Sequence, residues 1–171
     1  MHLLGDFSDG KNSFGRRFIC DHFEDRHPNT NGTNGFRVSR KVVAVPKDDT
    51  MIELTIMLWD LADSKGFESV RVSYLRGTAG AVAVCDITRP STIDGLYNYS
   101  RDLRAINPGT QLILAFNKTD LADQCAVTDM QIEPVALGIK PPYYLTRART
   151  GENVDDVFRH LSQLFVTNAE A

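Results

Sequence analysis

A glycine-bounded loop that ends in lysine stands near the start of the sequence, between a short apolar run and a helical segment. The apolar pair Leu3-Leu4 leads into Gly5–Lys11, which has the spacing GxxxxGK. Its glycines let backbone N–H groups turn around an anion, and the N-terminus of the following helix adds the positive end of its dipole. The loop therefore predicts a phosphate-binding α/β domain in which Lys11 reaches the β- and γ-phosphates, although a glycine-rich turn that begins a helix gives a similar pattern. The candidate phosphate-binding residues are Gly5, Ser8, Asp9, Gly10, Lys11, Asn12 and Ser13.

Apolar runs alternate with amphipathic segments along the rest of the chain. Such alternation is typical of βαβ units, which build a mostly parallel sheet with ligands at the carboxyl ends of its strands. The residues Pro46-Lys47-Asp48-Asp49 have the chemistry of a tight turn, so the strands on either side should form an antiparallel hairpin at one edge. We expect strands at 38–45, 51–58, 80–86, 111–116 and 142–145, and helices at 11–21, 92–106 and 153–165.

Length and composition exclude several classes of protein. The 171 residues, of which 42% are apolar, suit one domain with its own core. No apolar run approaches the roughly 20 residues that cross a bilayer, and a net charge of −3 argues against nucleic acid as a partner. The three cysteines form no CxxC pair, so we expect neither a disulfide framework nor a zinc site. We expect His2 and Arg17 at the surface, and the protein in the cytoplasm.

Two polar loops follow later apolar runs and together indicate recognition of guanine. Asn117-Lys118-Thr119-Asp120 comes directly after the strand at 111–116. A carboxylate at Asp120 can accept both the N1–H and the exocyclic amine of guanine, a donor pair that adenine lacks. In the second loop, Thr146–Gly151, Ala148 can present its backbone N–H to the guanine carbonyl oxygen. Either loop alone could be a polar turn, whereas the two together favour a guanine site.

Five segments stand in order along the chain: Trp59–Ala62, Tyr74–Gly80, Cys85–Thr88, Asn117–Leu121 and Thr150–Val154. They resemble the motifs of the Ras-superfamily small GTPases, and most of all those of the Rab branch. The resemblance covers nearly the whole chain and implies one P-loop small G-domain over residues 1–171. That fold would have a mixed, mostly parallel six-stranded sheet with one antiparallel edge, flanked by about five helices. The family also implies binding of GDP or GTP with Mg²⁺, effector or regulatory proteins at the switch region, and a role in vesicle trafficking.

The resemblance implies roles for single residues as well. Phe23 matches the aromatic residue that packs against guanine, at the family spacing from Lys11. Arg147 and Arg149 stand beside Ala148 in place of the usual serine and lysine. The residues that match the magnesium site are Asn12, Thr30 and Asp60.

The departures from the family pattern gather on the side of the γ-phosphate and the metal. Asn12 replaces the hydroxyl that ligates Mg²⁺, and Asp9 brings an acid into the phosphate loop. Asp63 replaces the glycine whose N–H meets the γ-phosphate, and Ser64 replaces the glutamine that orients the attacking water. These changes predict that GDP is preferred to GTP, that the Mg²⁺ site is weakened and that hydrolysis is impaired.

Other interpretations remain open on the sequence alone. Asp9, Asn12 and Asp63 each weaken phosphate binding, so the chain could be a pseudo-GTPase, an interaction domain that binds no nucleotide. It could also be a competent enzyme that positions water with Ser64 or Thr33, and Thr33 competes with Thr30 as the switch threonine. No cysteine stands near the C-terminal end, so these residues encode no prenyl anchor, and a location on endomembranes would need a tail or a partner.

Overall fold

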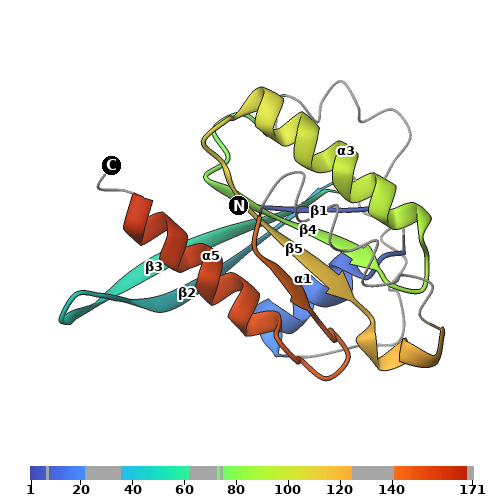
Figure 1. Cartoon of the computed structure of the whole chain (residues 1–171). Helices are drawn as coiled ribbons and strands as arrows, with labels where there is room; N and C mark the ends of the chain where they lie inside the picture. Colours follow the sequence, from blue (N-terminus) through green and yellow to red (C-terminus); the bar gives the residue numbers. More distant parts are fainter. Residues whose placement is uncertain (7, 22–35, 62–72, 74, 125–140, 169–171) are drawn as a thin grey trace.

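A computed structural model describes residues 1–6, 8–21, 36–61, 73, 75–124 and 141–168. Within them lies a six-stranded sheet in the order β2-β3-β1-β4-β5-β6 (Figure 1). Only β2 and β3 pair antiparallel, so the predicted mixed and mostly parallel sheet is confirmed. The strands are β1 (His2–Leu4), β2 (Phe36–Lys47), β3 (Thr50–Leu61), β4 (Gly80–Asp86), β5 (Gln111–Asn117) and β6 (Tyr143–Leu145).

Helices cover both faces of the sheet (Figure 1). The described residues contain the helices α1 (Lys11–Cys20), α3 (Ser91–Ile106) and α5 (Val154–Asn168), and the short 3-10 helix η1 (Thr119–Gln124). The expectation of about five helices extends into segments outside the described residues. None of the described helices is both long and apolar enough to cross a membrane.

Each face of the sheet has its own apolar core. On one face, α1 and α5 pack together, and the rings of Phe18 and Phe158 stack with their centroids 3.7 Å apart. On the other face, Leu96 and Leu103 of α3 lie in the core that includes Ala83 of β4. Every residue of β4 is buried, because helices cover it on both sides. This double burial explains why its sequence is a continuous apolar run.

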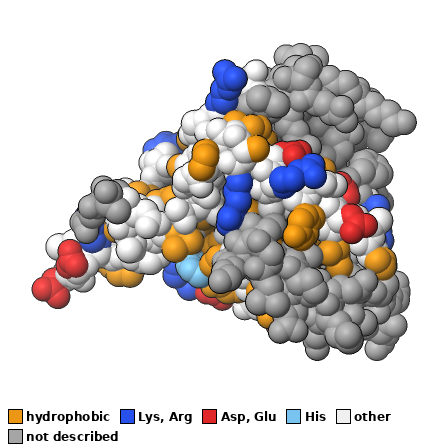
Figure 2. Space-filling model, turned by 45° about the horizontal axis from the view of Figure 1, so that its top comes forward, with side chains coloured by type: hydrophobic (Ala, Val, Ile, Leu, Met, Phe, Trp, Pro, Cys, Tyr) orange, Lys and Arg blue, Asp and Glu red, His pale blue; other side chains and the backbone are white. Residues whose placement is uncertain are grey.

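The β2–β3 hairpin forms one edge of the sheet and projects from the body of the protein (Figure 2). The predicted antiparallel hairpin is confirmed, but Pro46 and Lys47 belong to β2, where Lys47 pairs with Thr50, and the turn is the shorter Asp48-Asp49. Both strands are longer than the sequence predicts, because the pairing continues to Phe36 and Leu61. The exposed large apolar side chains of this hairpin are Val38, Val42, Met51 and Met57.

His2 is buried, which corrects the expectation that it lies at the surface. It is only 5% exposed, because β1 runs through the middle of the sheet between β3 and β4. Its Nδ1 lies 2.7 Å from the Thr78 hydroxyl oxygen, and its ring stacks on that of Trp59. Burial, with a further contribution from the positive N-terminus, lowers the pKa of His2 to about 4.

Candidate nucleotide-binding site

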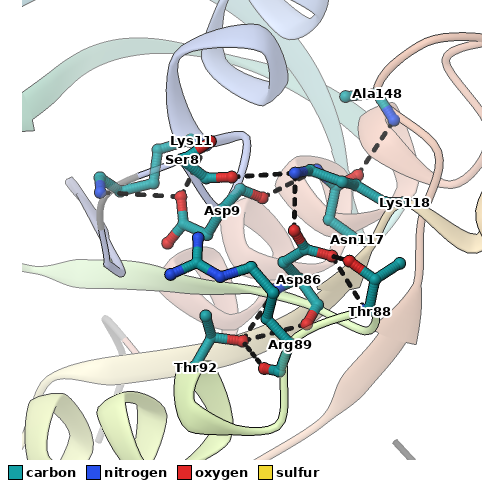
Figure 3. Close-up of polar contacts among 10 residues, drawn as sticks. All are labelled: Ser8, Asp9, Lys11, Asp86, Thr88, Arg89, Thr92, Asn117, Lys118 and Ala148. Carbon is teal, nitrogen blue, oxygen red and sulfur yellow. Dashed lines mark hydrogen bonds and ion pairs between the residues drawn. The ribbon is translucent and has the colours of Figure 1, made fainter. Parts of the chain in front are cut away.

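The candidate site lies where three parallel strands end side by side. The glycine loop leaves β1, Asp86 ends β4, and Asn117 ends β5 directly opposite Asp86 in the sheet register. Figure 3 shows these ends meeting in one polar cluster. Ligands of parallel α/β sheets bind at this edge, so the fold brings the predicted phosphate and base loops together.

The glycine loop turns sharply before α1. Gly10 has φ +96° and begins α1, and Ser8 has φ +64°, a left-handed value that is strained for a residue with a side chain. The Lys11 ammonium donates hydrogen bonds to the carbonyl oxygens of Gly5 at 2.7 Å and Asp6 at 2.8 Å. Lys11 is 5% exposed, so the loop folds closely around its own lysine.

Asp9 lies inside this loop and contacts the same lysine twice. Its Oδ1 accepts the Lys11 backbone N–H at 3.0 Å and lies 3.7 Å from the Lys11 ammonium nitrogen (Figure 3). Asp9 is 1% exposed. A carboxylate therefore stands among the positive groups that a phosphate loop directs at its ligand.

Lys118 holds the base loop, the phosphate loop and the end of β4 together. Its ammonium donates to the Ser8 carbonyl oxygen at 2.9 Å and to Asp86 Oδ2 at 2.6 Å. Asp86 Oδ1 accepts the backbone N–H and the hydroxyl of Thr88. Burial by itself raises the pKa of the Asp86 carboxyl, but the hydrogen bonds from Lys118 and Thr88 outweigh it and hold that pKa below its ordinary value. Sequence reasoning did not assign Asp86 to the site, although an Asp-x-Thr turn after a buried strand was a usable signal.

The Asn117 side chain joins the phosphate loop to the second base loop. Its amide nitrogen donates to the Asp9 carbonyl oxygen at 3.3 Å, and its amide oxygen accepts the Ala148 backbone N–H at 3.1 Å. The Thr146 hydroxyl also donates to that oxygen. Asn117 is 1% exposed, and its side chain links the two loops from the interior of the protein.

Arg17 contacts the second base loop, which corrects the expectation that it lies on the surface of its helix. From α1 its Nε donates to the Ala148 carbonyl oxygen at 3.0 Å, and its Nη2 donates to the carbonyl oxygen of Arg149. It also bonds the carbonyl and carboxylate of Asp21 at the end of the same helix. Arg17 therefore ties α1 to the second base loop.

The other predicted residues lie around this cluster. Asp120 is exposed on η1, and Arg147 bonds Thr119 and pairs with Glu152. Arg149 and Asn12 are exposed, and Ser13 is half-buried in the first turn of α1. Phe23, Thr30, Thr33, Asp63 and Ser64 lie outside the described residues.

The acids of the two predicted loops are placed differently. Asp120 is exposed, and the loop before it is held by the contact between Lys118 and the buried Asp86. At the other end, the carboxylate of Asp9 faces the groups that would meet phosphate. Of the predicted magnesium residues, Asp60 lies near the end of β3 beside Leu3, while Asn12 lies in the first turn of α1. Among the described residues, no three His, Cys, Asp or Glu side chains gather in a metal-binding group.

Comparison with known proteins identifies the family. The model of the Ras family matches residues 1–166. Ras-related protein Rab-22A of Mus musculus is 32% identical over 162 residues, which cover 94% of this chain and 80% of that protein. Ras-related protein Rab-4 of Dictyostelium discoideum is 29% identical over 170 residues, covering 99% of this chain and 80% of the relative. GTP-binding protein ypt4 of Schizosaccharomyces pombe is also 29% identical, over 98% of this chain and 71% of that protein. The chain belongs to the Ras family of small GTPases, in which it is most similar to the Rab proteins.

Proposed function

We propose that this chain binds guanine nucleotide, prefers GDP to GTP and hydrolyses GTP slowly. As a Rab-like protein it would regulate vesicle trafficking through effector or regulatory proteins at its switch region, on endomembranes where a tail or a partner supplies the anchor. The observation that carries the proposal is the Asn117 side chain, which bonds both the phosphate loop at Asp9 and the base loop at Ala148. Such a link serves a ligand with phosphate at one end and a base at the other.

Recognition of the base depends on Asp120. Its carboxylate is exposed at the start of η1, while the preceding Lys118 is held by Ser8 and Asp86. The lysine positions the loop, and the aspartate remains available to accept the two donors of guanine. Adenine offers no matching pair, so the loop selects guanine.

The preference for GDP rests on residues at the phosphate end. Asn12 offers an amide oxygen where the family uses a hydroxyl, and its oxygen is aimed differently toward a metal ion. Asp63 would place a negative charge beside the γ-phosphate, and like charges about 4 Å apart repel by about 4 kcal/mol at an effective dielectric of about 20. Ser64 is too short to orient water as glutamine does, which slows hydrolysis.

Calorimetric titration with GDP and with GTP, each with Mg²⁺, tests the proposal. We expect GDP to bind more tightly, and a GTP affinity equal to or above that of GDP would contradict the preference. The double variant Asn12→Ser with Asp63→Gly should raise the affinity for GTP more than that for GDP. Asp120→Asn is the control for the base, because it should weaken the binding of both nucleotides.

A pseudo-GTPase that binds no nucleotide is the second candidate, and the buried contact between Asp9 and Lys11 favours it. The two candidates differ in what the purified protein carries. Guanine nucleotide released on denaturation would exclude the pseudo-GTPase. A protein free of nucleotide that also fails to bind added GDP would support it.

A further inference from the structure

The carboxylate of Asp9 contacts both the backbone N–H and the ammonium of Lys11, the lysine that the sequence predicts to reach phosphate. The Lys11 backbone N–H, one of the first in α1, donates a hydrogen bond to Asp9 Oδ1 at 3.0 Å. The Lys11 ammonium lies 3.7 Å from the same oxygen (Figure 3). It also donates hydrogen bonds to the carbonyl oxygens of Gly5 and Asp6. The loop therefore supplies an anion from its own sequence.

Packing holds this carboxylate in place. Asp9 is 1% exposed, and its Oδ2 would lie only 2.0 Å from a Cβ added at Gly5. The Asp9 carboxylate therefore fills the space beside the first glycine of the loop. The negative charge of Asp9 also acts on the thiol of Cys85. Burial raises the pKa of that thiol, and the charges of Asp9 and Asp86 raise it further.

A nucleotide phosphate that approaches Lys11 meets a loop whose positive charge is already partly neutralised. It must share Lys11 with Asp9 or displace the Asp9 side chain, and both alternatives cost free energy because like charges repel strongly in a buried site. Asn117 contacts this residue through the Asp9 backbone carbonyl oxygen, which a substitution of the Asp9 side chain keeps. We therefore expect the cost to fall on the phosphates and not on guanine.

We propose that Asp9 is an internal anion that competes with nucleotide phosphate for Lys11 and so determines how tightly the site holds a diphosphate. This inference rests on the proposed function as far as GDP is the ligand. It adds that one carboxylate weakens the binding of phosphate and leaves the recognition of the base unaffected.

The second acid of the loop serves as a matched comparison. Asp6 Oδ1 accepts the hydroxyl of Tyr99 on α3 at 2.9 Å. The Asp6 side chain also lies against Gly95 of the same helix. The Asp6 carboxylate is therefore directed at α3, while only its carbonyl oxygen contacts Lys11.

The experiment compares the unmodified protein with Asp9→Asn, Asp9→Val and Asp6→Asn. Calorimetric titration is done with three probes: GDP, guanosine and inorganic pyrophosphate. Asp9→Asn keeps the size of the side chain and removes its charge, so it serves if Asp9→Val fails to fold. We expect both Asp9 variants to bind GDP and pyrophosphate about tenfold or more tightly than the unmodified protein. Guanosine affinity should stay within about twofold, and Asp6→Asn should strengthen GDP binding by at most about twofold.

The three probes separate this inference from the proposed function. Tighter pyrophosphate binding in the Asp9 variants supports the inference even if none of the proteins binds GDP, an outcome that would refute the proposed function. Tight GDP binding by all four proteins, with no gain in the folded Asp9 variants, overturns the inference and leaves the function intact. An equal gain with Asp6→Asn also overturns it, because any charge in the loop would then have the same effect.

Discussion

The ammonium nitrogen of Lys118 lies 2.6 Å from Oδ2 of Asp86, at the point where β4 and β5 end. Asp86 is 1% exposed, and the same ammonium reaches the Ser8 carbonyl oxygen of the phosphate loop. Both contacts hold separate parts of the polypeptide to one another at the ends of β4 and β5. The pair should therefore matter for stability before any ligand is bound.

Replacing Asp86 should make this contribution measurable. We expect Asp86→Asn to lower the free energy of unfolding by about 2 kcal/mol at pH 7, because a partly buried charge-assisted hydrogen bond is lost. The pKa of Asp86 is lowered in the folded protein, so its contribution is complete above the unfolded pKa of about 3.9 and is lost as the pH falls through the folded pKa. Urea unfolding should show the difference between the two proteins shrinking below about pH 4.

The control for this prediction is Asp102→Asn. Asp102 pairs with its exposed neighbour Arg101, so its removal should change the free energy of unfolding by less than about 0.5 kcal/mol. If the difference in the free energy of unfolding between Asp86→Asn and the unmodified protein stayed constant below about pH 4, the stabilising role of the ionised Asp86 would be contradicted.

His2 should make the fold sensitive to mild acid. Its pKa is about 4 in the folded protein and about 6.5 in an unfolded chain, so only the unfolded chain takes up the proton between these values. The free energy of unfolding should therefore fall as the pH drops below about 6.5, with a loss of about 2 kcal/mol by pH 5. His2→Leu should flatten this slope in urea unfolding at pH 7, 6 and 5. The same slope in both proteins would show that another group is responsible.

Removing the Arg17 guanidinium should loosen the second base loop. Arg17→Met keeps much of the side-chain length but loses the hydrogen bonds to Ala148 and Arg149. We expect GDP to bind about tenfold more weakly, because two charge-assisted hydrogen bonds that position the loop disappear. Arg159→Met is the matched control on α5, where Arg159 pairs with a neighbour on its own helix, Asp156. Unchanged GDP affinity in Arg17→Met would mean that the loop holds its shape unaided.

The Phe158 ring should be among the most costly side chains to truncate. It is fully buried and packs against both Phe14 and Phe18. We expect Phe158→Ala to lower the free energy of unfolding by about 3–5 kcal/mol in urea unfolding, because a cavity replaces the ring. Tyr97→Ala, at a ring that is 46% exposed, should cost less than about 1 kcal/mol.

The sheet and its hairpin could be predicted because their signals are local. The turn at Asp48 fixes the register of β2 and β3, and continuous apolar residues mark β4 as buried on both faces. The order of elements then places the loops after β1 and β5 at one edge. Local signals erred mainly at the ends of the hairpin, where pairing with the neighbouring strand continues beyond the apolar pattern.

The contacts that the sequence could not reveal join residues far apart in the chain. Arg17 and Ala148 are 131 positions apart, and His2 and Thr78 are 76 apart. No periodicity of α1 distinguishes an arginine that faces water from one that reaches a distant loop. The inward orientation of Asp9 is also invisible in the sequence, which reveals only that an acid stands in the loop. Each of these contacts depends on the tertiary arrangement.

The long outer strand β2 has a further consequence for how two copies of the protein behave at high concentration. β2 is an edge strand of the sheet that the described residues form, so in that sheet one side of its backbone has no neighbouring strand. Its cationic residues are Arg37, Arg40, Lys41 and Lys47, and it contains no acid. Two such strands that met edge to edge would bring like charges together along their length, which disfavours pairing. The positive charges of β2 therefore act against aggregation at this edge of the sheet.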